Sequence, residues 1–267
     1  MTEAGALRGR RDAVAHARRV VVKVGSSSIS GDNSGQIAPL VDALAAAHAR
    51  GVEVVLVSSG AIATGMPFLR LDARPLDLAT QQAAAAVGQN ALIHRYQDSL
   101  DRYGIVAGQV LLTATDLEHA TPRSNAQRAL ERLLGLRILV IVNENDTVAT
   151  QEIRFGDNDR LAGLVSELVG ADLLVLLSDV DALYTKPPAE PGAERITFVA
   201  HDDDLSGVEL GDIGSAGVGT GGAGTKIAAA RLAVESGVPV VLTSTTLVAE
   251  ALRGDEVGTW FGAAPVD

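Results

Sequence analysis

The sequence predicts an α/β protein whose mainly parallel central sheet is covered by helices on both faces. Apolar, β-branched runs of strand length alternate with segments of helical periodicity, as in parallel sheets joined by crossover helices. Aromatic residues make up 3% of the chain and hydrophobic residues 47%, so Ala, Val and Leu supply the core and favour helices packed on a sheet. Short polar turns follow several apolar runs, where open α/β sheets bind their ligands.

The strands and helices follow from local pattern along the chain. Strands are predicted at the apolar runs 19–24, 52–57, 105–112, 138–142, 173–177 and 238–242, with a closing edge strand at 258–261. Helices are predicted at 36–50, 77–101, 121–134, 160–169, 225–236 and 248–252. Gly51 suits the end of the first helix, and Pro122 suits the first turn of the third. Gly88 marks a point where the helix over 77–101 could break.

Composition and charge exclude several classes of function. The 33 acidic and 22 basic residues give a net charge of −11, and no basic patch indicates a nucleic-acid partner. The chain has no cysteine, which excludes thiol catalysis and zinc–thiolate sites. The five histidines lack the spacing of metal ligands, and no apolar run is long enough to span a bilayer. We therefore expect a cytoplasmic protein with no bound metal held by its own side chains, no nucleic acid and no membrane partner.

The densest polar stretch runs from Asn143 to Asp159 and directly follows the predicted strand 138–142. It contains five carboxylates and four amides, namely Glu144, Asp146, Glu152, Asp157, Asp159, Asn143, Asn145, Gln151 and Asn158. An acidic surface loop would not need this many amides beside a helix start. Similar polar turns at 25–28, 58–61 and 178–181 follow other predicted strands, so we expect all four to converge at one edge of the sheet.

Two lysines occur where burial of their charge would be costly. Lys23 lies inside an apolar strand, two residues before Gly25, and an unpaired ammonium there is unfavourable. Lys226 ends the glycine-rich segment 219–226, and glycines before a helix start suit a phosphate group. The spacing is not that of a P-loop, and a dinucleotide site is disfavoured because the segment does not follow a strand. Two cations beside a cluster of acids and amides suggest phosphoryl transfer.

These motifs resemble the glutamate 5-kinase family of the amino acid kinase superfamily. The resemblance covers about Arg19 to Phe261 and rests on VKVGS (22–26), VSSGAIA (57–63), NEND (143–146), GDND (156–159) and the segment 219–226. The NENDTVAT and FGDND pair is the most specific of them. The resemblance implies a three-layer α/β/α sandwich with a mainly parallel central sheet. It also implies transfer of the ATP γ-phosphate, with Mg²⁺, to the side-chain carboxylate of L-glutamate, the first step of proline biosynthesis.

The resemblance also assigns roles to individual residues. Lys23 and Lys226 would neutralise the transferring phosphoryl group, and Asp159 would hold both lysines. Ser59, Asp146 and Asn158 would bind glutamate. The nucleotide would be held by Lys23, Ser178, Asp179, Thr220, Gly221, Gly222, Ala223, Gly224, Thr225 and Lys226. L-Proline would act as feedback inhibitor at or near the glutamate site, and the protein would form a homo-oligomer.

The sequence departs from the family at three points. Many relatives continue into a small C-terminal domain of the PUA type, whereas we expect a kinase domain at 19–262 between an extension at 1–18 and a tail at 263–267. Ala182 and Ala223 replace residues that are usually Gly and Met near the nucleotide. Two alternatives stay open, namely another kinase of the superfamily, acting on aspartate or N-acetylglutamate, and a non-catalytic sensor of glutamate or proline.

Overall fold

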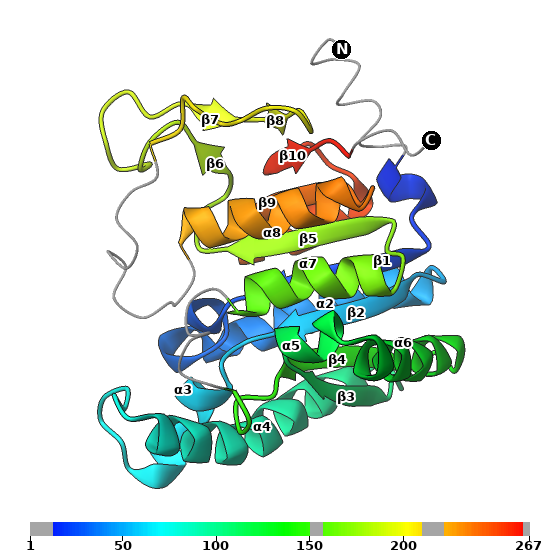
Figure 1. Cartoon of the computed structure of the whole chain (residues 1–267), viewed down its shortest axis with the longest axis vertical. Helices are drawn as coiled ribbons and strands as arrows, with labels where there is room; N and C mark the ends of the chain where they lie inside the picture. Colours follow the sequence, from blue (N-terminus) through cyan, green and yellow to red (C-terminus); the bar gives the residue numbers. More distant parts are fainter. Residues whose placement is uncertain (1–12, 150–156, 210–221, 264–267) are drawn as a thin grey trace.

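The computed structural model describes residues 13–149, 157–209 and 222–263. In these residues the main sheet has eight strands, β1 (Arg19–Val24), β2 (Glu53–Ser58), β3 (Ala107–Leu112), β4 (Leu139–Glu144), β5 (Leu173–Ser178), β8 (Phe198–Val199), β9 (Val240–Ser244) and β10 (Thr259–Phe261). Their order in the sheet is β3-β4-β2-β1-β5-β9-β10-β8 (Figure 1). Every pairing is parallel except that between β10 and β9. A separate antiparallel hairpin joins β6 (Leu183–Tyr184) to β7 (Arg195–Ile196).

The helices cover both faces of the sheet, so the predicted three-layer sandwich is confirmed (Figure 1). The helices are α2 (Ile37–Ala49), α3 (Ala61–Gly65), α4 (Leu78–Asp101), α5 (Ala114–Glu118), α6 (Ala120–Gly135), α7 (Asp157–Leu168), α8 (Ala223–Glu235) and α9 (Val248–Arg253). One core lies between the sheet and α2, α4 and α9, and it includes Val22, Leu56 and Tyr96. The other lies between the sheet and α5, α6, α7 and α8 and includes Val21 and Val55. Alternate strand residues enter opposite cores because strand side chains alternate across the sheet.

The described part of the chain differs from the sequence prediction in several elements. The helix over 78–101 is continuous at Gly88, so the predicted break is wrong. The strand at 259–261 is not the sheet edge, because β8 pairs with its outer side. The helix predicted from Arg160 begins at Asp157, so Asp159 belongs to its first turn. Asn143 and Glu144 lie within β4 rather than in the polar loop. The short helices α3 and α5 are additional to the prediction.

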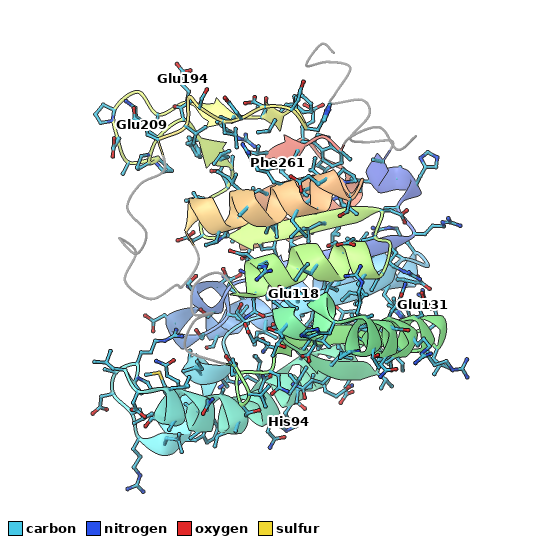
Figure 2. The ribbon with its side chains drawn as sticks, viewed as in Figure 1. His94, Glu118, Glu131, Glu194, Glu209 and Phe261 are labelled. Carbon is cyan, nitrogen blue, oxygen red and sulfur yellow. The ribbon has the colours of Figure 1, made fainter. Side chains whose placement is uncertain are left out.

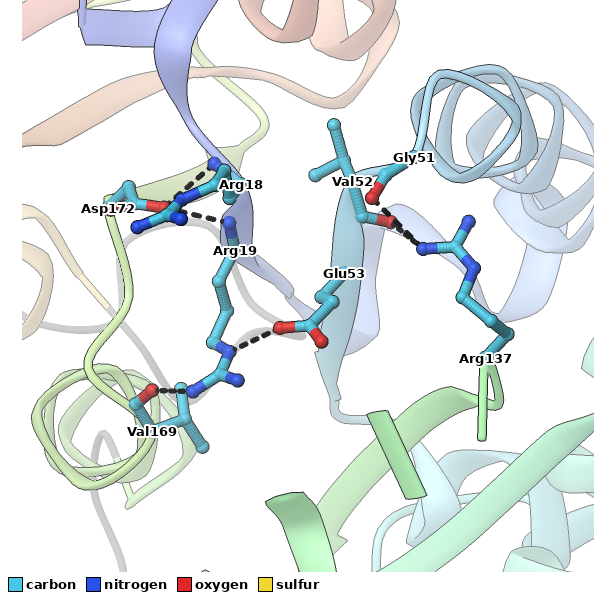
Figure 3. Close-up of polar contacts among 8 residues, drawn as sticks. All are labelled: Arg18, Arg19, Gly51, Val52, Glu53, Arg137, Val169 and Asp172. Carbon is cyan, nitrogen blue, oxygen red and sulfur yellow. Dashed lines mark hydrogen bonds and ion pairs between the residues drawn. The ribbon is translucent and has the colours of Figure 1, made fainter. Parts of the chain in front are cut away.

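Arginine side chains join the amino ends of the strands to one another (Figure 3). Arg19 Nε donates to Glu53 Oε2 at 2.8 Å, which links the starts of β1 and β2, and its guanidinium also donates to the carbonyl of Val169. Asp172 Oδ2, before β5, accepts from the backbone N–H of Arg19 at 2.9 Å. Arg137 donates to the carbonyl of Gly51 at 3.0 Å. These contacts lie at the amino ends of the strands, opposite the carboxyl ends that carry the polar turns.

Candidate functional site

Four polar turns meet at the carboxyl ends of adjacent parallel strands. The strands β4, β2, β1 and β5 are neighbours in that order, and all three pairings between them are parallel. Their carboxyl ends are followed by the chain segments at 145–149, 59–61, 25–28 and 179–181. The predicted convergence of the four turns is therefore confirmed, because parallel strands present their carboxyl ends at one edge.

Lys23 is buried in the central strand of the sheet. It lies in β1 between β2 and β5, opposite Val57 and Leu176, and its exposure is 4%. It lies two residues after Val21, so its side chain points to the face covered by α7 and α8. A surface position at a sheet edge, the ordinary alternative for a strand lysine, is thereby excluded.

Asp159 connects the two buried lysines. Its Oδ1 lies 2.5 Å from Lys23 Nζ, and its Oδ2 lies 3.6 Å from Lys226 Nζ. Thr225 Oγ1 donates to Oδ2 at 2.7 Å. Asp159 is 1% exposed and Lys226 is 7% exposed. Both ammonium groups thus pair with the same buried carboxylate, and the three groups together carry a formal charge of +1.

Helix geometry explains how residues distant in sequence form this cluster. Asp159 is in the first turn of α7, where the helix dipole favours a carboxylate. Lys226 is in the first turn of α8, where the same dipole disfavours a cation, so the carboxylate of Asp159 compensates for it. The N-cap of α8 is Gly222, whose lack of a side chain leaves the first-turn N–H groups without a side-chain cap. A helix start of this kind suits an anionic group.

The pKa values of the cluster shift in directions set by burial and charge. Burial and the nearby Lys226 lower the pKa of Lys23, although the carboxylate of Asp159 opposes this. Burial alone would raise the pKa of Asp159. The attraction of Lys23 and Lys226 and the hydrogen bond from Thr225 outweigh it, so the pKa of Asp159 is lowered. Asp159 is therefore a carboxylate at neutral pH and a poor proton acceptor.

The residues predicted to bind glutamate surround the same edge of the sheet. Ser59 is half-buried in the turn after β2, next to Gly60, whose φ of 95° gives the turn its left-handed conformation. Asp146 is half-buried, two residues after β4. Asn158 is in the first turn of α7, and its Oδ1 is buried with no hydrogen-bond partner among the described residues. A buried acceptor of this kind leaves a position for a donor from a ligand.

The residues predicted to hold the nucleotide are placed in two groups. Ser178 ends β5, is buried, and donates from Oγ to Asp179 Oδ1 at 3.0 Å. The second group is the start of α8, formed by Gly222, Ala223, Gly224, Thr225 and Lys226. Thr220 and Gly221 lie outside the described residues. Of the two departures from the family pattern, Ala182 is buried and Ala223 is exposed.

No group of three or more acidic or histidine side chains among the described residues is arranged to hold a metal ion. His94, which is labelled in Figure 2, lies on the outer side of α4, at an exposed position near Asp98. Magnesium that accompanies a nucleotide is bound mainly by phosphates and water. The residues present therefore fit a metal that the nucleotide carries better than one held by a protein cage.

Two features of the site were missed by sequence reasoning. Thr225 was assigned to the nucleotide, yet its hydroxyl donates to Asp159. Gln89 and Tyr96 of α4 are buried against β4 and β2, the strands that precede Asp146 and Ser59, which are predicted to bind L-glutamate. Their seven-residue spacing is a helical repeat, but the sequence alone does not say which strands that face of the helix meets.

Comparison with known proteins identifies the family to which this site belongs. The pattern of the Amino acid kinase family matches residues 18–244. The chain is 76% identical to a glutamate 5-kinase of Clavibacter sepedonicus, over 94% of this chain and 96% of that protein. It is 74% identical to a glutamate 5-kinase of Leifsonia xyli, over 95% of this chain and 94% of that protein. A glutamate 5-kinase of Salinispora arenicola is 58% identical over 96% of this chain, but over 70% of its own length.

The fold is also that of a solved kinase structure. The structure of carbamate kinase from Giardia lamblia bound to AMP-PNP matches 93% of this chain and 99% of its own, with a TM-score of 0.66. The sequence identity is 15%, so this likeness concerns the fold. In the described residues no helix is both long and apolar enough to cross a membrane.

Proposed function

The chain belongs to the amino acid kinase family, and within it to the glutamate 5-kinases. We propose how its residues carry out the glutamate 5-kinase reaction. The reaction transfers the γ-phosphoryl group of ATP to the side-chain carboxylate of L-glutamate, which is the first step of proline biosynthesis. The observation that carries the proposal is the buried Lys23–Asp159–Lys226 cluster at the carboxyl end of the sheet. Its net positive charge suits a group whose negative charge is spread over several oxygens in the transition state.

The acceptor needs no general base. A glutamate side chain has an ordinary pKa near 4.3, so its carboxylate is already a nucleophile at neutral pH. One carboxylate oxygen forms a bond to the γ-phosphorus while the bond from that phosphorus to the bridging oxygen breaks. ADP leaves, and the product is an acyl phosphate. The lowered pKa of Asp159 agrees with this scheme, because Asp159 then serves to hold the lysines rather than to accept a proton.

Lys23 and Lys226 act on the phosphoryl group. Both ammonium groups contact one carboxylate, so their positions relative to each other are fixed before substrate binds. Fixed donors stabilise developing charge without reorganisation during the reaction. Mg²⁺ bound to the phosphates would add further neutralisation of charge. Ser178, Asp179 and the start of α8 would hold the rest of the nucleotide.

Ser59, Asp146 and Asn158 would bind the amino acid. The carboxylate of Asp146 suits the α-ammonium group, and the hydroxyl of Ser59 can donate to a carboxylate oxygen. The buried Oδ1 of Asn158 is an acceptor and its amide N–H groups are donors, so it can serve either group. L-Proline carries the same α-carboxylate and a secondary ammonium, so we propose that it binds as an inhibitor at this site, in a cytoplasmic homo-oligomer.

A hydroxylamine trap tests the activity. The protein is incubated with Mg-ATP and, in parallel, L-glutamate, L-aspartate or N-acetyl-L-glutamate, and an acyl phosphate is captured as a hydroxamate. We expect product with L-glutamate alone. Product with another acid would assign a different kinase of the superfamily, and binding of glutamate or proline without any product would assign a sensor.

Substitution of Asp146 tests the amino-acid site. We expect Asp146→Ala to weaken L-glutamate binding and to reduce inhibition by L-proline, measured as KM for glutamate and the proline concentration for half inhibition. Normal inhibition with weakened glutamate binding would show that the two ligands occupy different sites.

A further inference from the structure

We infer that the polar stripe of α4, formed by Gln82, Gln89 and Tyr96, is a positioning device for the amino-acid site, with Gln89 as its central residue. The three residues are seven apart, so they lie along one face of the helix. Gln82 Nε2 donates to the carbonyl of Ala149 at 3.3 Å, and Gln89 Nε2 donates to the carbonyl of Glu144 at 3.1 Å. The Tyr96 hydroxyl lies 2.9 Å from Ser58 Oγ.

Each contact fixes a segment that carries a residue proposed to bind glutamate. Ser58 precedes Ser59, and Glu144 lies two residues before Asp146. Ala149 lies three residues after Asp146, so the stripe holds the chain on both sides of that carboxylate. At 1.5 Å per residue the stripe extends about 21 Å along one rigid helix. The distance between the β2 turn and the loop after β4 is thereby set by α4.

The amide of Gln89 has one orientation that satisfies all its neighbours. The backbone N–H of Glu144 donates to Asn143 Oδ1 at 2.9 Å, which leaves Asn143 Nδ2 as the group that faces Gln89. Asn143 Nδ2 therefore donates to Gln89 Oε1, at 3.2 Å, and Gln109 Nε2 donates to the same oxygen at 3.0 Å. Gln89 Nε2 is then directed to the carbonyl of Glu144.

Burial makes this network sensitive to change. Gln89 is 8% exposed, Asn143 is 2% exposed and Glu144 is 4% exposed. Removal of the Gln89 amide leaves the buried amide of Asn143 and the buried carbonyl of Glu144 without the partner that they have in the native structure. Buried polar groups in that state rearrange or admit water. We expect the end of β4, and with it Asp146, to shift or loosen.

The test compares Gln89 with a second glutamine of the same helix. Gln97 is also in α4, but its side chain accepts from the N–H of Ala107 at 2.8 Å and donates to the carbonyl of Ile105 at 3.1 Å, at the amino end of β3. We expect Gln89→Ala and the similarly sized Gln89→Met to raise KM for L-glutamate about tenfold, with KM for ATP changed less than twofold. We expect Gln97→Ala to lower thermal stability and to leave both KM values unchanged.

The inference rests on the proposed amino-acid site. The assay distinguishes failure of the proposed function from failure of the role inferred for Gln89. If the unsubstituted chain makes no hydroxamate from L-glutamate, the proposed function fails before the variants are compared. If it does, and the folded Gln89 variants keep the normal KM for glutamate while losing stability like Gln97→Ala, Gln89 is a structural residue and the inference is wrong. A thermal-shift titration with L-glutamate gives a readout that does not depend on turnover: a weaker shift for Gln89→Met than for Gln97→Ala supports the inference, and equal shifts overturn it.

Discussion

At the scale of single residues, the site depends on an excess of one positive charge in a buried cluster. Two ammonium groups share one carboxylate, so the cluster suits a further anionic group such as a phosphoryl group. Removal of a lysine leaves the other ammonium group paired with Asp159, whereas removal of the carboxylate leaves two buried ammonium groups without the counter-charge that they share. The two kinds of substitution should therefore affect catalysis and stability in different proportions.

The first prediction concerns Lys226. We expect Lys226→Met to lower kcat by about 10²–10³, the usual loss when one group that stabilises transition-state charge is removed. KM for L-glutamate should change little, because the role proposed for Lys226 is on the phosphoryl group. Thermal unfolding should stay near that of the unsubstituted protein, since Lys23 and Asp159 remain paired at 2.5 Å. An unchanged kcat would remove Lys226 from the mechanism.

The second prediction concerns Asp159. We expect Asp159→Asn to lower the free energy of unfolding at pH 7 by about 3 kcal/mol, because it leaves Lys23 and Lys226 without their shared counter-charge. Urea denaturation, with Lys226→Met as the comparison variant, measures the difference. Equal losses for the two variants would show that the charge balance of the cluster does not control stability.

The pH dependence of this loss follows from the lowered pKa of Asp159. Below about pH 3.9, the ordinary pKa of an Asp side chain, the unfolded chain binds a proton that the folded protein does not. The contribution of Asp159 to the free energy of unfolding is therefore present above about pH 3.9 and is lost as the pH falls below it. We therefore expect the difference between Asp159→Asn and the unsubstituted protein to shrink as pH falls from 7 toward 3.5. A difference that grows over this range would contradict the assigned direction.

At the scale of elements, α4 determines where the turn after β2 is placed. Gly65 of α3 and Gly88 of α4 meet at a point where the two backbones are in contact. A Cβ atom at Gly88 would lie 1.7 Å from the carbonyl oxygen of Ala61, and one at Gly65 would lie 1.9 Å from that of Ala84. Neither position has room for a methyl group, so the two glycines set the distance between α3 and α4.

The third prediction follows from this contact. We expect Gly88→Ala to lower the free energy of unfolding by about 1–3 kcal/mol, as overpacking does, despite the better helix propensity of Ala. KM for L-glutamate should rise, because α3 begins two residues after Ser59. Urea denaturation and the hydroxamate assay measure the two effects. Gly135→Ala at the end of α6 is the matched control, since a Cβ atom there meets nothing within 4 Å, and it should leave stability and KM near normal.

At the scale of the whole molecule, the proposed chemistry and the arginine contacts lie at opposite ends of the strands. The proposed catalytic and binding residues lie at the carboxyl ends of the strands, and the arginine contacts in Figure 3 lie at the amino ends. Arg137 donates to the carbonyls of Gly51 and Val52 at 3.0 and 3.3 Å and also to that of His48, so one side chain ties the start of β4 to the end of α2.

The fourth prediction tests this separation. We expect Arg137→Ala to lower Tm by about 2–4 °C, the shift that a loss near 1 kcal/mol produces in a chain of this size. Both KM values and kcat should stay unchanged. Arg128→Ala is the control, because in the contacts described Arg128 reaches only the side chain of Asn125; its Tm should not move. A change in kcat for Arg137→Ala would mean that the two edges are coupled.

The sequence by itself determined the fold class and most of the candidate site. Periodicity reports local burial, so the main strands were located to within one or two residues, and the rule for parallel sheets predicted where their polar turns meet. Lys23 stood out because an ammonium in an apolar strand needs a partner. The resemblance of motifs, rather than periodicity, named Asp159 as that partner.

Only the tertiary structure decided which residues support the site. The contact of Gly65 with Gly88 and the network around Gln89 join elements that are distant in sequence. A glycine and a glutamine inside a helix give the same local signal whether they face solvent or a neighbouring backbone. For the same reason Gly88 suggested a helix break, and the strand at 259–261 looked like a sheet edge. The physical cause is that helix and strand patterns depend on which face is buried, while the identity of the neighbour depends on how the whole chain packs.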